Sequence, residues 1–194
     1  KNNRPGIIQT DFPYQMAAIG APSPKGNVAK KGMAISVGNG ASVLFDTDLV
    51  RMAAGWTGAL ITTTGVSFDG SHGGFPKISG TQLFGTPAVA GWADTSGQFL
   101  DDRPEPFGPI NADQGRWDGH YMVGDQVTLA YSVHGTKIYE QPSSLAVGET
   151  IGFVRSLKVS GFDSSASQSI SMMVADVDGF SGQSVRGRAS LMEP

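Results

Sequence analysis

From Met33 onward the chain is a series of short apolar runs separated by turn residues, and β-branched side chains are frequent in the runs. The clearest example is "DQVTLAYSVHGTKIYE", residues 125–140, in which apolar and polar positions alternate. A period of two is typical of a strand that buries one face. The face expected on the core comprises Val127, Leu129, Tyr131 and Val133. Gly135-Thr136 then predicts a two-residue type II′ turn, because the glycine comes first.

Other runs repeat this pattern at short, regular spacing. Asn39-Gly40 separates "MAISV" from "ASVLFD" and predicts a hairpin, since both turn residues tolerate positive φ. Toward the end of the chain, residues 151–159 and 170–174 each place apolar side chains on one parity and predict two further strands. Strands are also expected in residues 16–19, 49–56, 59–68 and 76–84.

Strands of this length and spacing, with no long helical pattern and no repeat of fixed period, are typical of a sandwich rather than of alternating strand–helix units. The predicted fold is all-β: an antiparallel, jelly-roll-like β-sandwich with one long irregular loop and little or no helix. Residues 1–31 contain four prolines, which break regular structure. We expect residues 1–31 to form an extended lead-in and residues 32–194 to form a single β-sandwich domain.

The long irregular loop is expected between Gly85 and Gly119, where no periodicity is visible and Pro104, Pro106 and Pro109 occur. Long ordered loops are uncommon in compact domains and often carry function. A surface insertion without a binding role is the alternative interpretation.

Composition narrows the classes of function. The net charge is −3 and no block of Lys or Arg occurs. A nucleic-acid binder needs a basic face, so we expect no nucleic-acid partner. The chain has no cysteine, which excludes disulfides, thiolate nucleophiles and CxxCH haem attachment within it. No apolar run reaches the length that crosses a bilayer, so no membrane span is expected.

The stretch "SFDGSHGGFP", residues 67–76, surrounds one histidine with glycines. Asp69 and His72 are candidate ligand-binding residues, because a histidine near a carboxylate can act as a base, a metal ligand or an anion anchor. Turn chemistry is the alternative: Asp69-Gly70 turns the chain between two strands, and Pro76 ends the loop.

Calcium is a candidate cofactor, because several turns are rich in carboxylates and calcium takes six to eight oxygen ligands. The candidate metal ligands are Asp46 and Asp48 in "DTD", and Asp176 and Asp178 in "DVDG". No stretch has the spacing of an EF-hand loop, and Asp-Gly turns are also common without a metal.

Aromatic residues next to glycine supply a further candidate site. Exposed aromatic faces suit sugar binding, although the same rings also anchor cores. Trp56 follows a buried-looking strand and is expected in the core. Trp92 and Trp117 are expected at the surface, and the candidate ligand-binding residues are Trp92, Trp117 and Tyr121.

Catalytic chemistry has little support in the sequence. There is no GxSxG elbow, no HExxH motif, and no carboxylate pair that stands out among the acids of the long loop. We therefore name no catalytic residue, and we favour a non-catalytic chain over an enzyme.

Several segments in order carry a family resemblance: "VLFDTDLVRMAAGWTGALITTTGVSFDGSHG", "LFGTP", "GWAD", "FGPI" and "HYMVGDQVTLAYSVHGTKIYEQP". Together, over about residues 34–142, they resemble an uncharacterised bacterial domain of unknown function. That domain stands N-terminal to sugar-dehydrogenase-like β-propellers, c-type cytochrome domains, or both, in large secreted proteins.

The resemblance implies context rather than chemistry, because the family has no established catalytic residues. It implies a periplasmic or secreted protein, with a propeller or cytochrome domain or subunit as partner. Three functions stay open: a non-catalytic module that packs against or recruits this partner in a carbohydrate-oxidising or redox assembly, a carbohydrate-binding module, or a carbohydrate-active hydrolase or lyase.

Overall fold

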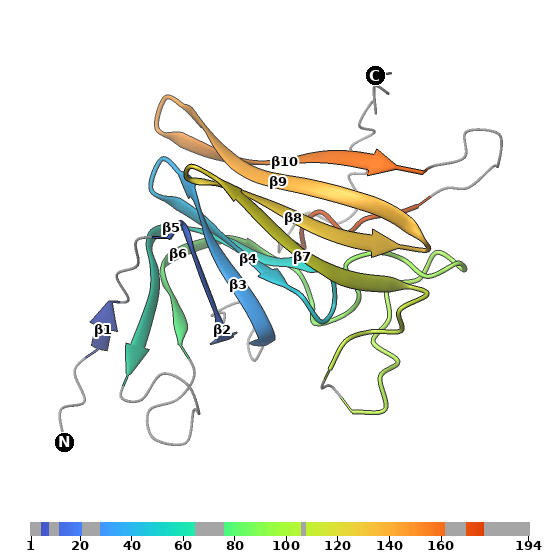
Figure 1. Cartoon of the computed structure of the whole chain (residues 1–194). Coiled ribbons are helices and arrows are strands. Elements are labelled where there is room, and N and C mark those ends of the chain that lie inside the picture. The colour runs from blue at the N-terminus through green and yellow to red at the C-terminus, as the bar shows by residue number, and fades with distance from the viewer. Residues whose placement is uncertain are drawn as a thin grey trace.

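The computed structural model describes residues 5–7, 12–20, 28–64, 76–105, 108–161 and 170–176, which form ten strands and no helix (Figure 1). The strands are β1 (Pro5–Ile7), β2 (Tyr14–Gly20), β3 (Val28–Gly38), β4 (Ala41–Asp46), β5 (Arg51–Thr64), β6 (Lys77–Gly85), β7 (Gly115–Val123), β8 (Gln126–Val133), β9 (Thr136–Val147) and β10 (Thr150–Ser160). Across these ranges, no helix is long and apolar enough to cross a membrane.

The strands form two sheets, which confirms the prediction of an all-β, sandwich-like fold. The first sheet has the order β1-β5-β4-β3-β2-β6, and β6 pairs with β5 as well as with β2. This sheet therefore closes on itself. The second sheet has the order β10-β9-β8-β7 and lies across the first in Figure 1. All pairings between the described strands are antiparallel except a single parallel pair, Gly20 with Lys77.

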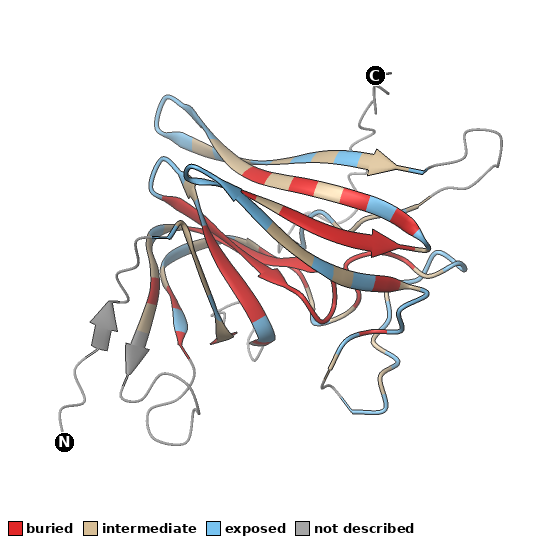
Figure 2. Ribbon diagram, viewed as in Figure 1, coloured by how far each residue is buried: buried red, intermediate tan, exposed pale blue. Residues whose placement is uncertain are grey.

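The two sheets create two cores, and β4 contributes to both. Val43 and Phe45 face the core between the sheets, whereas Leu44 faces the core inside the closed sheet. Successive side chains of a strand point to opposite faces, so all six β4 residues are buried. The closed sheet leaves little room: a Cβ on Gly32 would lie 2.9 Å from Leu44 Cδ1. Trp56 is fully buried there, as predicted. Figure 2 shows the buried residues concentrated in β3, β4 and β5 and on β8 and β9.

Two hairpin turns test the turn predictions. Asn39 and Gly40 both have positive φ, 52° and 66°, and they join β3 to β4 as predicted. The β8–β9 turn differs from the prediction by one residue, because His134 and Gly135 form it with φ of 47° and 77°. Positive φ at both central positions is the type I′ pattern, whose twist matches the flanking strands. His134 Nε2 lies 2.8 Å from the Ala93 carbonyl oxygen, which ties this turn to the long loop.

The predicted faces of β8 and β10 are confirmed, but the last predicted strand is wrong. The four alternating residues of β8 are buried, and β10 alternates between exposed and half-buried positions. Residues 170–176 form only two isolated bridges, Trp92 with Met172 and Gly85 with Asp176. The apolar side chains at alternate positions, Ile170 and Met172, pack onto the core, but this segment is not a strand of a sheet.

The beginning of the chain contributes to the closed sheet. The strand expected at residues 16–19 is β2, which pairs with β3, and β3 already begins at Val28. Part of the predicted lead-in therefore belongs to the first sheet. The predicted long loop lacks strands in its described residues 86–105 and 108–114, and β7 begins at Gly115.

Candidate functional site

The structure brings few of the candidate residues together. Asp69, His72 and Asp178 lie outside the described residues. Asp176 is exposed, and its backbone N–H donates to the Gly85 carbonyl oxygen at 2.7 Å. Among the described residues, Asp176 does not join Asp46 and Asp48 in a group that could hold a metal ion.

The three aromatic candidates differ in how far they are buried. Trp92 is only 4% exposed, so the expectation of a surface position is wrong; its ring packs against Tyr131 with centroids 6.2 Å apart. The irregular loop folds back between the sheets at this point and carries the indole inward. Trp117 is half-buried and packs on Phe45 at 5.5 Å. Tyr121 is exposed.

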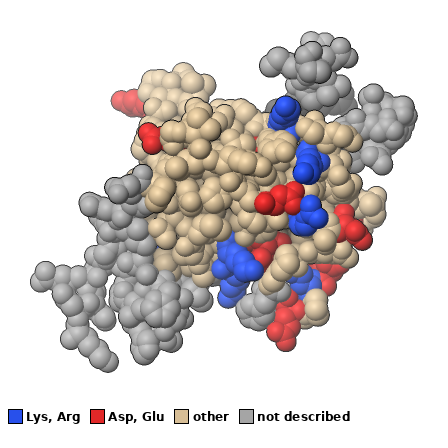
Figure 3. All heavy atoms as spheres, in the orientation of Figure 1, with Lys and Arg blue, Asp and Glu red and all other residues tan. Residues whose placement is uncertain are grey.

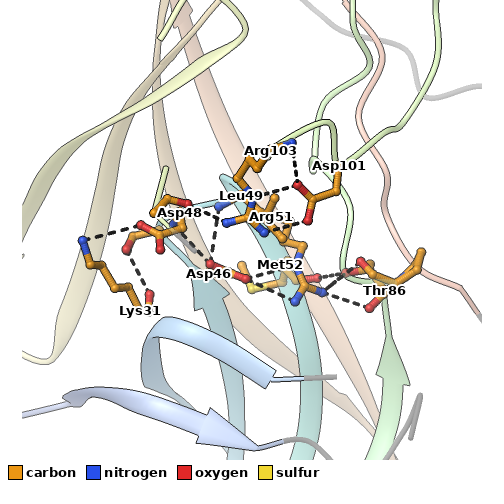
Figure 4. Close-up of polar contacts among 12 residues, drawn as sticks. Lys31, Asp46, Asp48, Leu49, Arg51, Met52, Thr86, Asp101 and Arg103 are labelled. Atoms are coloured by element: carbon orange, nitrogen blue, oxygen red, sulfur yellow. Dashed lines mark hydrogen bonds and ion pairs between the residues drawn. The ribbon is translucent and has the colours of Figure 1, made fainter. Parts of the chain in front are cut away.

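Asp46, a candidate calcium ligand, forms a buried ion pair with Arg51 instead (Figure 4). The two residues lie opposite each other in the β4–β5 register. Arg51 Nε and Nη2 donate to Asp46 Oδ2 at 3.3 and 3.2 Å, and the N–H groups of Asp48 and Leu49 donate to Oδ1. Asp46 therefore serves as the partner of an arginine and as the cap of the β4–β5 turn.

The ionisation of this pair reflects its burial. Burial raises the pKa of Asp46, while Arg51 and the two backbone N–H groups oppose the rise. Burial likewise lowers the pKa of Arg51, and Asp46 opposes that change. A buried pair of this kind is costly to desolvate, and removal of one partner leaves an uncompensated charge.

Asp48 shares the turn but points elsewhere, toward Lys31, with Oδ1 and Nζ 3.7 Å apart. Within the described part of the chain, no group of three or more His, Asp or Glu side chains is arranged to hold a metal ion. Asp46 and Asp48, although close in sequence, therefore do not form a shared set of metal ligands.

The same cluster fixes the start of the long loop. Arg51 Nη1 donates to the carbonyl oxygens of Thr86 and Pro87 at 2.9 and 3.0 Å. Further along the loop, Arg103 pairs with Asp101 through two 2.7 Å bonds and donates to the Gly108 carbonyl oxygen (Figure 4). The side-chain bond from Arg103 lowers the pKa of Asp101. These contacts support the loop, and each carboxylate in them faces an arginine.

An exposed apolar surface lies at one end of the second sheet, near the β7–β8 and β9–β10 turns. We call it the docking surface and define it by Tyr121, Val123, Leu145 and Val147. Val123 and Val147 are 77% and 66% exposed. Figure 3 shows a wide area without charged side chains over this part of the molecule, whereas the Lys and Arg side chains gather elsewhere on the visible face.

Two carboxylates stand at the rim of the docking surface. Asp125 lies in the β7–β8 turn and Glu149 in the β9–β10 turn, and both are exposed. Residues 121–128 and 141–154 contain no lysine or arginine. The apolar centre is therefore bordered by negative charge.

A second aromatic residue accompanies Tyr121. The Tyr121 and Tyr139 rings are 6.4 Å apart, with 43° between their planes. On the same sheet, Gln141 Nε2 donates to Gln126 Oε1 at 3.1 Å. No pattern in the sequence marks Tyr139 as a site residue; the pairing of β8 with both β7 and β9 brings it beside Tyr121.

Comparison with known families assigns the chain. Residues 43–140 match a family described as Domain of unknown function (DUF6797), and the chain belongs to this family. No curated protein and no solved structure shows significant similarity to the chain. The matched range extends from β4 to β9 and includes the buried Asp46–Arg51 pair, the long loop and Tyr121.

Proposed function

We propose that the chain is a non-catalytic module that packs against a partner domain or subunit through the docking surface. The observation that carries this proposal is the group of large apolar side chains left exposed on one face of a folded sheet. Contiguous exposed apolar surface is uncommon on monomeric proteins and marks interaction sites. Tyrosine is also enriched at protein interfaces.

The charges around the docking surface define the chemistry of the partner. Asp125 and Glu149 border the apolar centre, and the neighbouring strand segments carry no basic residue. A complementary partner presents an apolar patch with lysine or arginine at its rim. Rim charges of this kind mainly raise the association rate and weaken as salt screens them.

The pairing of two buried carboxylates supports a non-catalytic module. The buried carboxylates Asp46 and Glu140 each face an arginine, Arg51 or Arg155. This pairing supports a structural role for these two carboxylates.

The setting of the module follows from the family resemblance seen in the sequence. We place the module in the periplasm or outside the cell, where it joins a carbohydrate-oxidising or redox assembly. The partner is a propeller or c-type cytochrome, either as a further domain or as a separate subunit.

Site-specific photo-cross-linking tests the docking surface. A benzophenone amino acid replaces Val123 in the gene product expressed in its own cell, and mass spectrometry locates the linked peptides. We expect links to one recurrent apolar and basic surface, and a second substitution, Leu145→Asp, should reduce them severalfold. The control position is Ala112, an exposed residue in the turn before β7. Equal cross-linking from positions 112 and 123 would overturn the proposal.

Carbohydrate binding is a second candidate function, and the Tyr121–Tyr139 pair favours it. Two neighbouring rings on a sheet, with side-chain amides nearby, can stack on sugar rings and hydrogen-bond their hydroxyl groups. Affinity electrophoresis on a panel of polysaccharides tests this function, and Tyr139→Ala should abolish any retardation. Unchanged mobility of the wild-type chain on every polysaccharide would count against it.

A further inference from the structure

A pocket of about 380 Å³ opens between the two sheets on the side of β10. Its walls come from β4, β5, β6, β9, β10 and the segment of residues 172–175. The wall is mostly apolar and includes Val43, Met52, Phe84, Phe153 and Met172. Ligand pockets in proteins have volumes of roughly 300–1,000 Å³ and combine an apolar lining with a few polar groups. This pocket has both properties.

The aromatic wall is held in place by close packing. The Phe84 and Phe153 rings meet edge to face at 5.1 Å. The Phe84 ring lies directly over Gly55, where a Cβ would come within 2.0 Å of Phe84 Cε1. The absence of a side chain at Gly55 therefore sets the position of the ring and the shape of the pocket.

Residues 170–176 form the wall nearest the opening. Met173 N–H donates to the Gly91 carbonyl oxygen at 2.9 Å, and Asp176 N–H donates to the Gly85 carbonyl oxygen at 2.7 Å. Between these two anchors, Val174 and Ala175 line the pocket and are exposed to solvent. The segment thus places two small side chains at the mouth.

Arg155 supplies the polar group of the pocket. Its Nε and Nη2 donate to the two oxygens of the fully buried Glu140 at 2.5 and 2.9 Å, and Nη1 donates to the Met173 carbonyl oxygen at 3.3 Å. Tyr131 donates to Glu140 at 2.6 Å. These bonds use three of the five guanidinium donors. Glu140 compensates the charge of Arg155, so the ion pair at the pocket offers N–H donors but has no net charge.

We propose that this pocket binds a neutral small molecule with a largely apolar body and one hydrogen-bond acceptor oxygen directed at Arg155. The apolar lining favours the body of such a molecule, and the remaining guanidinium donors favour a carbonyl or hydroxyl oxygen. An anion is disfavoured, because the fully buried carboxylate of Glu140 already compensates the positive charge of Arg155. The proposal does not depend on the docking surface, which uses different residues at another part of the second sheet.

Nuclear magnetic resonance titration with three probes of matched shape tests the pocket: acetophenone, ethylbenzene and benzoate. Acetophenone should cause saturable shifts in amides next to Phe84, Phe153 and Met172. Ethylbenzene, which lacks the acceptor, should bind about tenfold more weakly, and benzoate should bind more weakly than acetophenone. Equal affinities for acetophenone and ethylbenzene would overturn the role of Arg155.

Two variants separate binding from folding. Ala175→Trp fills the mouth from an exposed position and should weaken acetophenone binding at least tenfold, whereas Ala112→Trp in a distant turn should leave it unchanged. Replacement of Arg155 alone would leave the charge of Glu140 buried without a partner, so the second variant is Glu140→Gln with Arg155→Met, which keeps an acceptor for the Tyr131 hydroxyl. It should bind the ketone and the hydrocarbon equally. The absence of saturable shifts with any probe, or full binding by Ala175→Trp, would refute the site.

Discussion

The Asp46–Arg51 pair makes the sharpest prediction about stability. Arg51→Met keeps an apolar stem of similar length but removes both bonds to Asp46 and the bonds from Nη1 to the Thr86 and Pro87 carbonyl oxygens. The Asp46 side chain is 3% exposed, so its carboxylate loses its counter-charge without gaining water. Breaking a buried pair in this way costs about 3–5 kcal/mol. For a domain of this size the melting temperature should fall by roughly 6–20 °C.

Guanidinium unfolding followed by circular dichroism measures the loss. The matched control is Arg116→Met, which breaks a pair with Asp118 in which the arginine side chain is 60% exposed. Exposed pairs contribute about 1 kcal/mol or less. A double variant, Asp46→Asn with Arg51→Met, should be more stable than Arg51→Met alone, because no buried charge is left. Equal, small losses in Arg51→Met and Arg116→Met would refute the reasoning.

Three further predictions follow from individual contacts. Arg103 lowers the pKa of Asp101, so the Asp101–Arg103 pair stabilises the fold above about pH 4, and this stabilisation is lost as the pH falls through the lowered pKa. Asp101→Asn should therefore make the midpoint of urea unfolding fall less steeply toward acid pH, and an unchanged slope would contradict this prediction. Gly55→Ala places a methyl group against the Phe84 ring and should cost about 1–3 kcal/mol in thermal unfolding, whereas Gly152→Ala, whose nearest neighbour would be 3.7 Å away, should be tolerated. Trp92 is buried, so a variant that retains only this tryptophan should resist acrylamide quenching, and quenching at the rate of a free indole would show that the burial is wrong.

Local patterns in the sequence predicted the strands well. The alternation in β10 corresponds to half-buried and exposed faces, and the predicted core residues of β8 are buried, although Ala130 and Ser132 on its other face are buried as well. Asn39-Gly40 forms the turn that its chemistry indicates. The prediction placed the β8–β9 turn one residue too far along the chain, at Gly135-Thr136, because it assumed a type II′ turn with glycine at the first central position. The structure has a type I′ turn at His134-Gly135. Few non-glycine residues adopt a left-handed conformation, and histidine is among those that do so more often.

Long-range pairing lies beyond such patterns. No local signal shows that β6 pairs with both β5 and β2 and closes the first sheet. The same limit explains Trp92: glycine and polar neighbours indicate a surface loop, and only the return of the loop to the core buries the ring. Ile170 and Met172 have the spacing of a strand, yet residues 170–176 form only isolated bridges in the structure.

The site could be predicted only in part. The opposite charges in "FDTDLVR" signal a pair across a tight turn, which could have identified Arg51 as the partner of Asp46. The docking surface needs the arrangement of β7, β8 and β9, because Tyr121 and Leu145 are far apart in sequence. The same holds for the pocket, whose walls come from strands of both sheets.

Hydroxyl-radical footprinting tests the docking surface most directly. The oxidation rates of Tyr121, Leu145 and Val147 are compared between the isolated chain and the native assembly purified from the cell that makes it. The docking proposal predicts severalfold protection of these three residues in the native assembly, with no protection of the exposed Leu83 in β6. Equal oxidation of Tyr121, Leu145 and Val147 in both samples would contradict it.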